Sequence, residues 1–135
     1  MSDDSGKQSQ EEDSFATAPY SILVVDDNPD LTDFLKKALG EYFKRILIAS
    51  DGVEALQLIK IHTPDIIVSD VMMPRMNGYE LCKNIKEDIT ISHIPVILLT
   101  ARDDKQSQIS GYKNGADAYL TKPFEVEMLM ELIRN

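Results

Sequence analysis

The 135-residue chain is poor in several residue types that characterise particular classes of protein. Its one cysteine, Cys82, excludes an internal disulfide framework and fits a reducing compartment such as the cytoplasm. Its two histidines, His62 and His93, cannot form with that cysteine a Cys/His zinc site of the usual spacing. Because it has no run of about 18 apolar residues and no basic-then-apolar leader, we expect no membrane contact by this domain and no signal peptide.

Basic residues are also in deficit. Lys and Arg number 14 against 23 Asp and Glu, which gives a formal net charge of −9 at pH 7. Contacts to nucleic-acid phosphates need Lys and Arg, so we expect no direct nucleic-acid binding. Hydrophobic residues nevertheless make up 43% of the chain, which is enough for one compact domain with its own core.

Two regions of different composition divide the chain. Residues 1–18 are acidic and polar, and we interpret them as a disordered acidic linker or tail. Residues 19–135 form the predicted domain, in which short apolar runs alternate with segments whose apolar residues recur at helical spacing. The runs predict strands at 22–25, 45–49, 65–70, 95–100 and 118–121, each followed by a helix. This alternation predicts an α/β fold whose parallel sheet is covered on both sides.

Polar and charged residues stand where the predicted strands end. Asp26 and Asp27 follow the first strand, and Asp70 ends the third. Thr100 ends the fourth strand, and Lys122 follows the fifth. Ligands of such sheets bind outside the carboxyl ends of the strands, so we expect these five side chains to converge on one edge.

The predicted cluster favours a metal ion and a phosphoryl group. Three carboxylates in one place repel each other, and a hard cation relieves that repulsion. Carboxylate, carbonyl and water ligands without imidazole or thiolate favour Mg²⁺ or Mn²⁺. A lysine and a hydroxyl would contact other oxygens of the same anion, and a carboxylate beside the metal can form an acyl phosphate. Any one of these residues alone is more simply explained as a helix cap or a surface charge. The prediction of a site therefore depends on all five occurring together at the strand ends.

With these residues in place, the sequence resembles the receiver domains of bacterial two-component response regulators. The matching segments are ILVVDDNPD at 22–30, PDIIVSDVMMPRMNGYELC at 64–82, IPVILLTA at 94–101 and GADAYLTKPF at 115–124. The resemblance covers residues 20–134. It implies a flavodoxin-like, doubly wound (βα)5 three-layer sandwich with strand order 2-1-3-4-5.

The resemblance also implies the roles of the acidic residues. Asp70 would be the phosphoacceptor. Asp27, Asp70 and the backbone carbonyl of Met72 would bind Mg²⁺ (or Mn²⁺) directly, and Asp26 would bind it largely through water.

Further roles follow for the residues around the phosphoryl group. Lys122, joined to the next residue by a cis peptide bond, would pair with the phosphoryl oxygens. Thr100 would swing toward the phosphoryl group, and Tyr119 would turn inward behind it. Met72 and Arg102 would tune hydrolysis; because neither orients water well, we predict a long-lived acyl phosphate.

A partner and a context are implied as well. The phosphoryl donor would be a sensor histidine kinase or its phosphohistidine domain. Segments 70–82 and 91–101 look most like receivers of hybrid kinases, so we expect a cytoplasmic domain excised from a hybrid histidine kinase that the inner membrane could anchor. A free-standing single-domain response regulator is the alternative, and the resemblance allows a phosphorylation-dependent dimer. The isolated domain would catalyse only its own phosphorylation and dephosphorylation.

Two surface features are also predicted. The fourth helix, at about 105–114, has the weakest apolar stripe and is our candidate for the switching element. Partner docking is expected on the first helix around Leu31 and Phe34, with Phe34 the stronger candidate of the two for a core position.

Three other classes of protein fit less well. A phosphatase of the haloacid dehalogenase type needs a second Asp two residues after Asp70, where this chain has Met72. A flavodoxin-like FMN binder needs a hydroxyl- and glycine-rich loop after the first strand, but residues 26–30 are acidic and would repel the phosphate. A docking module without chemistry would not need both Asp70 and Lys122.

Overall fold

The computed structural model describes residues 20–101 and 115–134. The predicted tail at 1–18, Arg102 and the predicted helix at 105–114 therefore lie outside the described residues. Within those ranges the strands are β1 (Ser21–Val25), β2 (Arg45–Ala49), β3 (Ile66–Asp70), β4 (Val96–Ala101) and β5 (Ala118–Lys122). The helices are α2 (Pro29–Leu39), α3 (Gly52–His62), α4 (Gly78–Glu87) and α6 (Val126–Arg134).

The five strands form one parallel sheet in the order β2-β1-β3-β4-β5, which confirms the predicted topology. Leu23 of β1 lies between Leu47 of β2 and Ile67 of β3. The chain moves from β1 to β2 on one side and then returns to β3 on the other. The strand order thus reverses beside β1, and this is the point at which sheets of this kind bind ligands.

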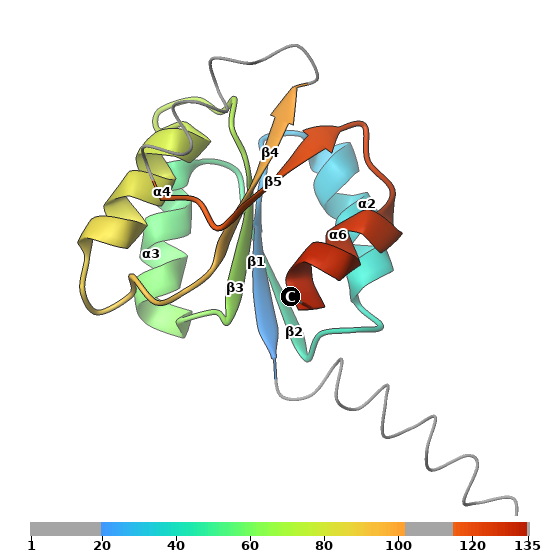
Figure 1. The fold of residues 1–135 in the computed structure, drawn as a ribbon, viewed down its shortest axis with the longest axis horizontal. Helices are drawn as coiled ribbons and strands as arrows, with labels where there is room; N and C mark the ends of the chain where they lie inside the picture. The colour runs from blue at the N-terminus through green and yellow to red at the C-terminus, as the bar shows by residue number, and fades with distance from the viewer. Residues whose placement is uncertain (1–19, 102–114, 135) are drawn as a thin grey trace, which may run out of the picture.

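Helices cover both faces of the sheet. Figure 1 shows α3 and α4 on one side and α2 and α6 on the other. Alternate residues of β1 enter the two cores, since Leu23 packs with the α3 and α4 side and Val24 with the α2 and α6 side. Because successive strand side chains point to opposite faces, a strand between two helical layers needs apolar residues throughout. This explains the continuous apolar runs in the sequence.

Side-chain caps fix where the helices begin. The Asn28 side chain accepts a hydrogen bond from the Asp30 amide at 3.0 Å, with Pro29 in the first helical turn. The Asn77 side chain caps α4, and the Glu80 side chain accepts in return from the Asn77 amide. Such caps each contribute about 1 kcal/mol to helix stability.

The first helix differs from its predicted form in two respects. Apolar residues at helical spacing predict that this helix reaches Tyr42. The helix α2 instead ends at Leu39, and the Tyr42 amide donates to the Leu39 carbonyl in a turn. The expectation that Phe34 is more buried than Leu31 is wrong: Phe34 is 55% exposed, whereas Leu31 packs against the core. Consecutive helical residues are about 100° apart, so burial of Leu35 turns its neighbour Phe34 toward solvent.

Two further features belong to residues 20–101 and 115–134. The Lys122–Pro123 peptide bond is cis, as the resemblance implies. No helix in those ranges is both long enough and apolar enough to cross a membrane.

Candidate functional site

The predicted site residues come from the carboxyl ends of neighbouring strands. Asp26 and Asp27 directly follow β1, and Asp70 is the last residue of β3. Thr100 is the last residue but one of β4, and Lys122 ends β5 opposite Ala101 of β4. In Figure 1 the arrowheads of β4 and β5 point to this edge of the sheet.

The three carboxylates do meet. Asp26, Asp27 and Asp70 each present one oxygen, and the three oxygens lie within 4.8 Å of one another. Asp26 and Asp70 are buried, whereas Asp27 is exposed. The backbone fixes Asp26, because its amide donates to the Ala49 carbonyl at 3.0 Å and its Oδ1 accepts from the Asn28 amide at 2.9 Å. The cluster therefore has two buried members and one that faces solvent.

Lys122 bridges the two buried carboxylates. Its Nζ lies 3.1 Å from Asp26 Oδ2 and 3.1 Å from Asp70 Oδ1. Burial alone would lower the pKa of Lys122, but the hydrogen bonds to Asp26 and Asp70 outweigh burial and raise it. The lysine is therefore charged, and three carboxylates beside one ammonium leave a formal charge of −2 that a divalent cation would cancel.

Asp70 is the electrostatically strained member of the cluster. Burial raises the pKa of Asp70, the charge of Asp26 raises it further, and Lys122 offsets only part of this effect. A carboxylate in such a position gains stability when a cation or a covalent group removes its charge. Perturbed acids of this kind are characteristic of functional sites.

Thr100 carries a buried hydroxyl with no hydrogen-bond partner among residues 20–101 and 115–134. The residue is 0% exposed and belongs to the strand that pairs with β3 and β5. Buried polar atoms are nearly always paired, so an unpaired hydroxyl needs an explanation. An anion bound at this edge of the sheet would supply the missing acceptor.

The loop that follows Asp70 passes very close to the strand end. The Gly78 amide donates to the Val71 carbonyl at 2.9 Å, and a Cβ on Gly78 would collide with the Asp70 carbonyl oxygen. Glycine is therefore required where this loop enters α4. Met72, whose carbonyl is the predicted metal ligand, lies in this loop and is 70% exposed.

The other predicted residues are only partly placed. Tyr119 lies in β5, partly buried against the core cluster on the α3 and α4 side. Arg102 falls outside the described residues, so the structure places only one of the two predicted rate-tuning positions.

The donor set fits a hard divalent cation. All three side-chain ligands are carboxylates, two of them are buried, and the nearest basic group is a lysine that an incoming cation could free for another anion. Oxygen ligands that leave room for water and phosphate are typical of Mg²⁺ sites. The described residues include no thiolate or imidazole within this cluster.

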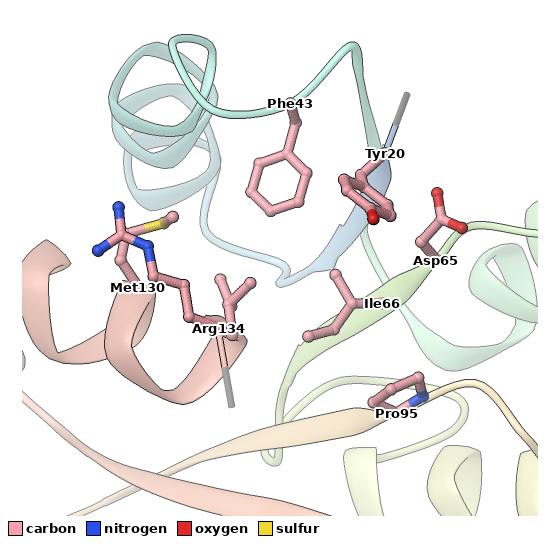
Figure 2. A pocket seen from close by; sticks show the side chains of 8 residues that line it. Tyr20, Phe43, Asp65, Ile66, Pro95, Met130 and Arg134 are labelled. Carbon is pink, nitrogen blue, oxygen red and sulfur yellow. The ribbon is translucent and has the colours of Figure 1, made fainter. Parts of the chain in front are cut away.

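A separate hollow of about 360 Å³ lies at the opposite edge of the sheet. Figure 2 shows Tyr20, Asp65 and Pro95 around it, together with Met130 and Arg134 of α6. Tyr20 precedes β1, Asp65 precedes β3 and Pro95 precedes β4, so this hollow opens at the amino ends of the strands. It contains none of the predicted site residues.

Sequence reasoning missed one ion pair near the site. Asp51 caps α3, because its Oδ1 accepts a hydrogen bond from the Glu54 amide at 2.9 Å. Its Oδ2 also binds Arg75 of the loop after β3, with 2.7 Å to both Nε and Nη2. The partners are 24 residues apart in different segments, so no local pattern in the sequence could reveal the pair.

Comparison with known proteins identifies the family of the chain. The model of the response regulator receiver domain family matches residues 22–134. A histidine kinase of Formosa agariphila is 45% identical over 115 residues, which are 85% of this chain and 8% of the kinase. The response regulator MprA of Mycobacterium sp. strain KMS is 42% identical over 116 residues, which are 86% of this chain and 50% of the regulator. The chain thus spans half or less of these relatives.

Solved structures with a similar fold come from the same family. The receiver domain of a signal transduction histidine kinase from Syntrophus aciditrophicus has a TM-score of 0.79 and 36% identity, covering 85% of this chain and 88% of that one. The chemotaxis response regulator CheY4 of Vibrio cholerae has a TM-score of 0.78 and 30% identity, covering 85% and 96%. Since the family model spans nearly all of the described residues and both sequence and structure agree, this chain belongs to the response regulator receiver domains of two-component signalling.

Proposed function

We propose that this domain accepts a phosphoryl group on Asp70 from the phosphohistidine of a sensor kinase and thereby changes conformation to control an output. One observation carries the proposal: the Lys122 ammonium joins the buried carboxylates of Asp26 and Asp70 at 3.1 Å each, at the carboxyl edge of the sheet. A structural ion pair would need only one carboxylate. Two buried acids around one lysine, with a third acid within 4.8 Å, suit a site that neutralises an incoming anion.

The reaction is a displacement at phosphorus. An oxygen of the ionised Asp70 carboxylate attacks the phosphorus atom and forms the acyl phosphate, while the bond from phosphorus to the imidazole nitrogen breaks and its electron pair stays on the imidazole. Lys122 then pairs with the phosphoryl oxygens, and the Thr100 hydroxyl donates to another of them. Tyr119 turns inward behind Thr100.

A divalent metal belongs to the proposed site. Asp27 and Asp70 would hold it directly with the Met72 carbonyl, and Asp26 would hold it largely through water. Bound Mg²⁺ or Mn²⁺ would supply charge neutralisation for the phosphoryl oxygens.

Hydrolysis of the acyl phosphate is proposed to be slow. The Met72 side chain is exposed beside the site but has no group that orients water, and Arg102 carries neither an acid nor an amide. We expect the isolated domain to stay phosphorylated for much longer than seconds, and a half-life of seconds would overturn this part of the proposal.

We further propose that the domain comes from a cytoplasmic part of a hybrid histidine kinase. The support is similarity: relatives named as histidine kinases reach 45% and 40% identity. Relatives named as response regulators reach 42%, so a free-standing regulator is the competing proposal. Sequencing the gene on both sides of this coding segment decides between them, because a hybrid chain requires an adjoining kinase core in the same reading frame.

The test of phosphoryl acceptance is direct. The wild-type domain and the Asp70→Asn variant are incubated with acetyl phosphate, with and without Mg²⁺, and analysed by intact mass spectrometry. We expect one phosphoryl group on the wild type, only with metal, and none on the variant. Asp33→Asn, which removes an exposed acid of α2, is the matched control and should be modified like the wild type.

Two other results of this experiment would count against the proposal. An unmodified wild type in the presence of Mg²⁺ would refute the proposal, and turnover of free phosphate esters would favour a phosphatase instead. Size-exclusion chromatography with and without beryllofluoride tests the phosphorylation-dependent dimer.

A further inference from the structure

The loop of residues 71–77 connects β3 to α4 and carries Met72, the proposed carbonyl ligand of the metal. Met72 is 70% exposed, so its own packing does not fix the position of its backbone. At the two ends of the loop, the Val71 carbonyl accepts from the Gly78 amide at 2.9 Å. Contacts made by residues between these two ends must therefore fix the backbone of the loop and the position of the Met72 carbonyl.

An ion pair joins the middle of this loop to the start of α3. Arg75 Nε and Nη2 each lie 2.7 Å from Asp51 Oδ2. The Asp51 side chain is only 6% exposed, whereas that of Arg75 is 60% exposed. Asp51 is thus the fixed partner and Arg75 the one that is held.

Asp51 is itself firmly anchored. Its Oδ1 caps α3 by accepting from the Glu54 amide at 2.9 Å, which leaves Oδ2 for Arg75. The Glu54 amide, followed by Arg75, holds the pKa of Asp51 below its usual value despite burial. The carboxylate is therefore ionised at neutral pH, and hydrogen bonds from a charged donor to a charged acceptor are the strong ones.

The backbone supports the same junction. The Gly52 amide donates to the Met76 carbonyl at 3.2 Å, and a Cβ on Gly52 would lie 2.7 Å from Met76 Cγ. Only glycine allows the helix start to come so close to the loop. Met73 and Met76 also pack against the core cluster beneath them.

Arg75 adopts a backbone conformation that it would not choose by itself. Its φ is 64°, in the left-handed region that non-glycine residues rarely occupy. Such a conformation persists only where surrounding contacts enforce it. The contact that the structure provides to the Arg75 side chain is Asp51, so loss of the pair would let the loop relax between Met72 and Gly78.

We propose that Arg75 and Asp51 are positioning residues, whose ion pair holds the 71–77 loop in the path that presents the Met72 carbonyl to a divalent cation bound beside Asp70. This inference rests on the proposed function, because it concerns the metal site of that function. Neither residue contacts the reacting atoms. Their effect on metal affinity passes through the shape of the loop.

The experiment is a double-mutant cycle with Mg²⁺ as the probe. The wild type, Arg75→Ala, Asp51→Asn and the double variant are titrated with MgCl₂ and followed by ¹⁵N NMR of the backbone amides. We expect each single variant to raise the Mg²⁺ dissociation constant by about tenfold, the scale of losing an outer partner of a metal ligand. The double variant should be no weaker than either single variant, because all three lose the same contact.

Charge alone predicts a different result. Arg75→Ala removes a positive charge near a cation site and would by that effect tighten Mg²⁺ binding. Lys83→Ala, at an exposed position of α4, makes the same change in net charge and is the matched control. It should bind Mg²⁺ as the wild type does or slightly more tightly, and Arg75→Lys, which keeps the charge but has one donor group, should recover part of the affinity.

A second readout separates positioning from loss of folding. Asp51→Asn keeps the side-chain oxygen that caps α3, so the variant should fold with the circular dichroism spectrum of the wild type, at a melting temperature lowered only by the lost ion pair. Hydrogen exchange of the Gly52 amide, which donates to Met76, should accelerate in the Arg75 variants.

The possible results distinguish failure of the positioning role from failure of the proposed function. Wild-type-like or tighter Mg²⁺ binding by Arg75→Ala, or additive losses in the cycle, would overturn the positioning role while the proposed function stands. A wild type that gives no response to Mg²⁺ would overturn the proposed function and this inference together.

Discussion

Replacing Asp70 by asparagine should stabilise the metal-free protein. The side chain keeps its shape, but the cluster loses one of three carboxylates whose oxygens lie within 4.8 Å of one another. It also loses the contact of Asp70 Oδ1 with Lys122 Nζ at 3.1 Å. The direction of the effect depends on which of these two electrostatic terms is larger.

The distances allow an estimate. At an effective dielectric constant of about 20, charges 4.8 Å apart repel by roughly 3.5 kcal/mol, so Asp26 and Asp27 together repel Asp70 by roughly 7 kcal/mol. The ammonium at 3.1 Å attracts it by roughly 5 kcal/mol. Water screens the exposed Asp27, which reduces the difference, while burial of the charge of Asp70 adds to it. We expect Asp70→Asn to raise the free energy of unfolding by about 1 kcal/mol, or the melting temperature by about 3–5 °C.

The effect should depend on pH. Burial and the Asp26 charge raise the pKa of Asp70 above its ordinary value of 3.8. Over the range from 3.8 up to the raised value, the folded wild type retains a proton that the unfolded chain releases. Wild-type stability therefore falls, relative to the variant, as pH rises through this range. Below pH 3.8 the carboxyl is neutral in both states, and the advantage of the variant should disappear.

Thermal unfolding with EDTA at pH 7 and at pH 3.5, followed by circular dichroism, measures both effects. Asp33→Asn is the control for removing an exposed acid and should stay within about 0.5 kcal/mol of the wild type. Adding Mg²⁺ should stabilise the wild type more than Asp70→Asn. A variant that is less stable than the wild type in EDTA at pH 7 would refute the view that the cluster is repulsive.

Three further perturbations test other parts of the structure. Burial raises the pKa of Cys82 to about 11, so roughly one molecule in a thousand carries the thiolate at pH 8. We therefore expect Cys82 to react slowly with DTNB until urea unfolds the protein, and rapid reaction of the folded protein would contradict this. Leu98→Ala should cost about 2–5 kcal/mol in urea unfolding because Leu98 is 0% exposed. Phe34→Ala should cost less than about 0.5 kcal/mol because Phe34 is 55% exposed, and equal losses would contradict this difference in burial. Gly78→Ala should lower the free energy of unfolding by at least about 2 kcal/mol, since its Cβ would collide with the Asp70 carbonyl oxygen. If calorimetry shows no such loss, the loop can move aside.

The sequence by itself determined the order along the chain and the type of the elements that the structure describes. Apolar runs between helical patterns predicted all five strands to within one residue at every end, and they predicted a sheet covered on both faces. These features are local, because side-chain period and caps depend on residues a few positions apart. The acids at the strand ends followed from the same reasoning, since parallel strands bring their carboxyl ends to one edge.

Packing between distant segments decided the remaining features. Lys122 and Asp26 are 96 residues apart, and only the folded sheet sets the 3.1 Å distances at which the lysine bridges two acids instead of one. The exposure of Phe34 depended on the rotation of α2 about its own axis. The apolar residues of the helix did not determine this rotation closely enough to tell which of two neighbouring positions, Phe34 or Leu35, faces the core. The pair of Arg75 and Asp51 had no signature in the sequence, because a loop and a helix start meet there only through tertiary contacts.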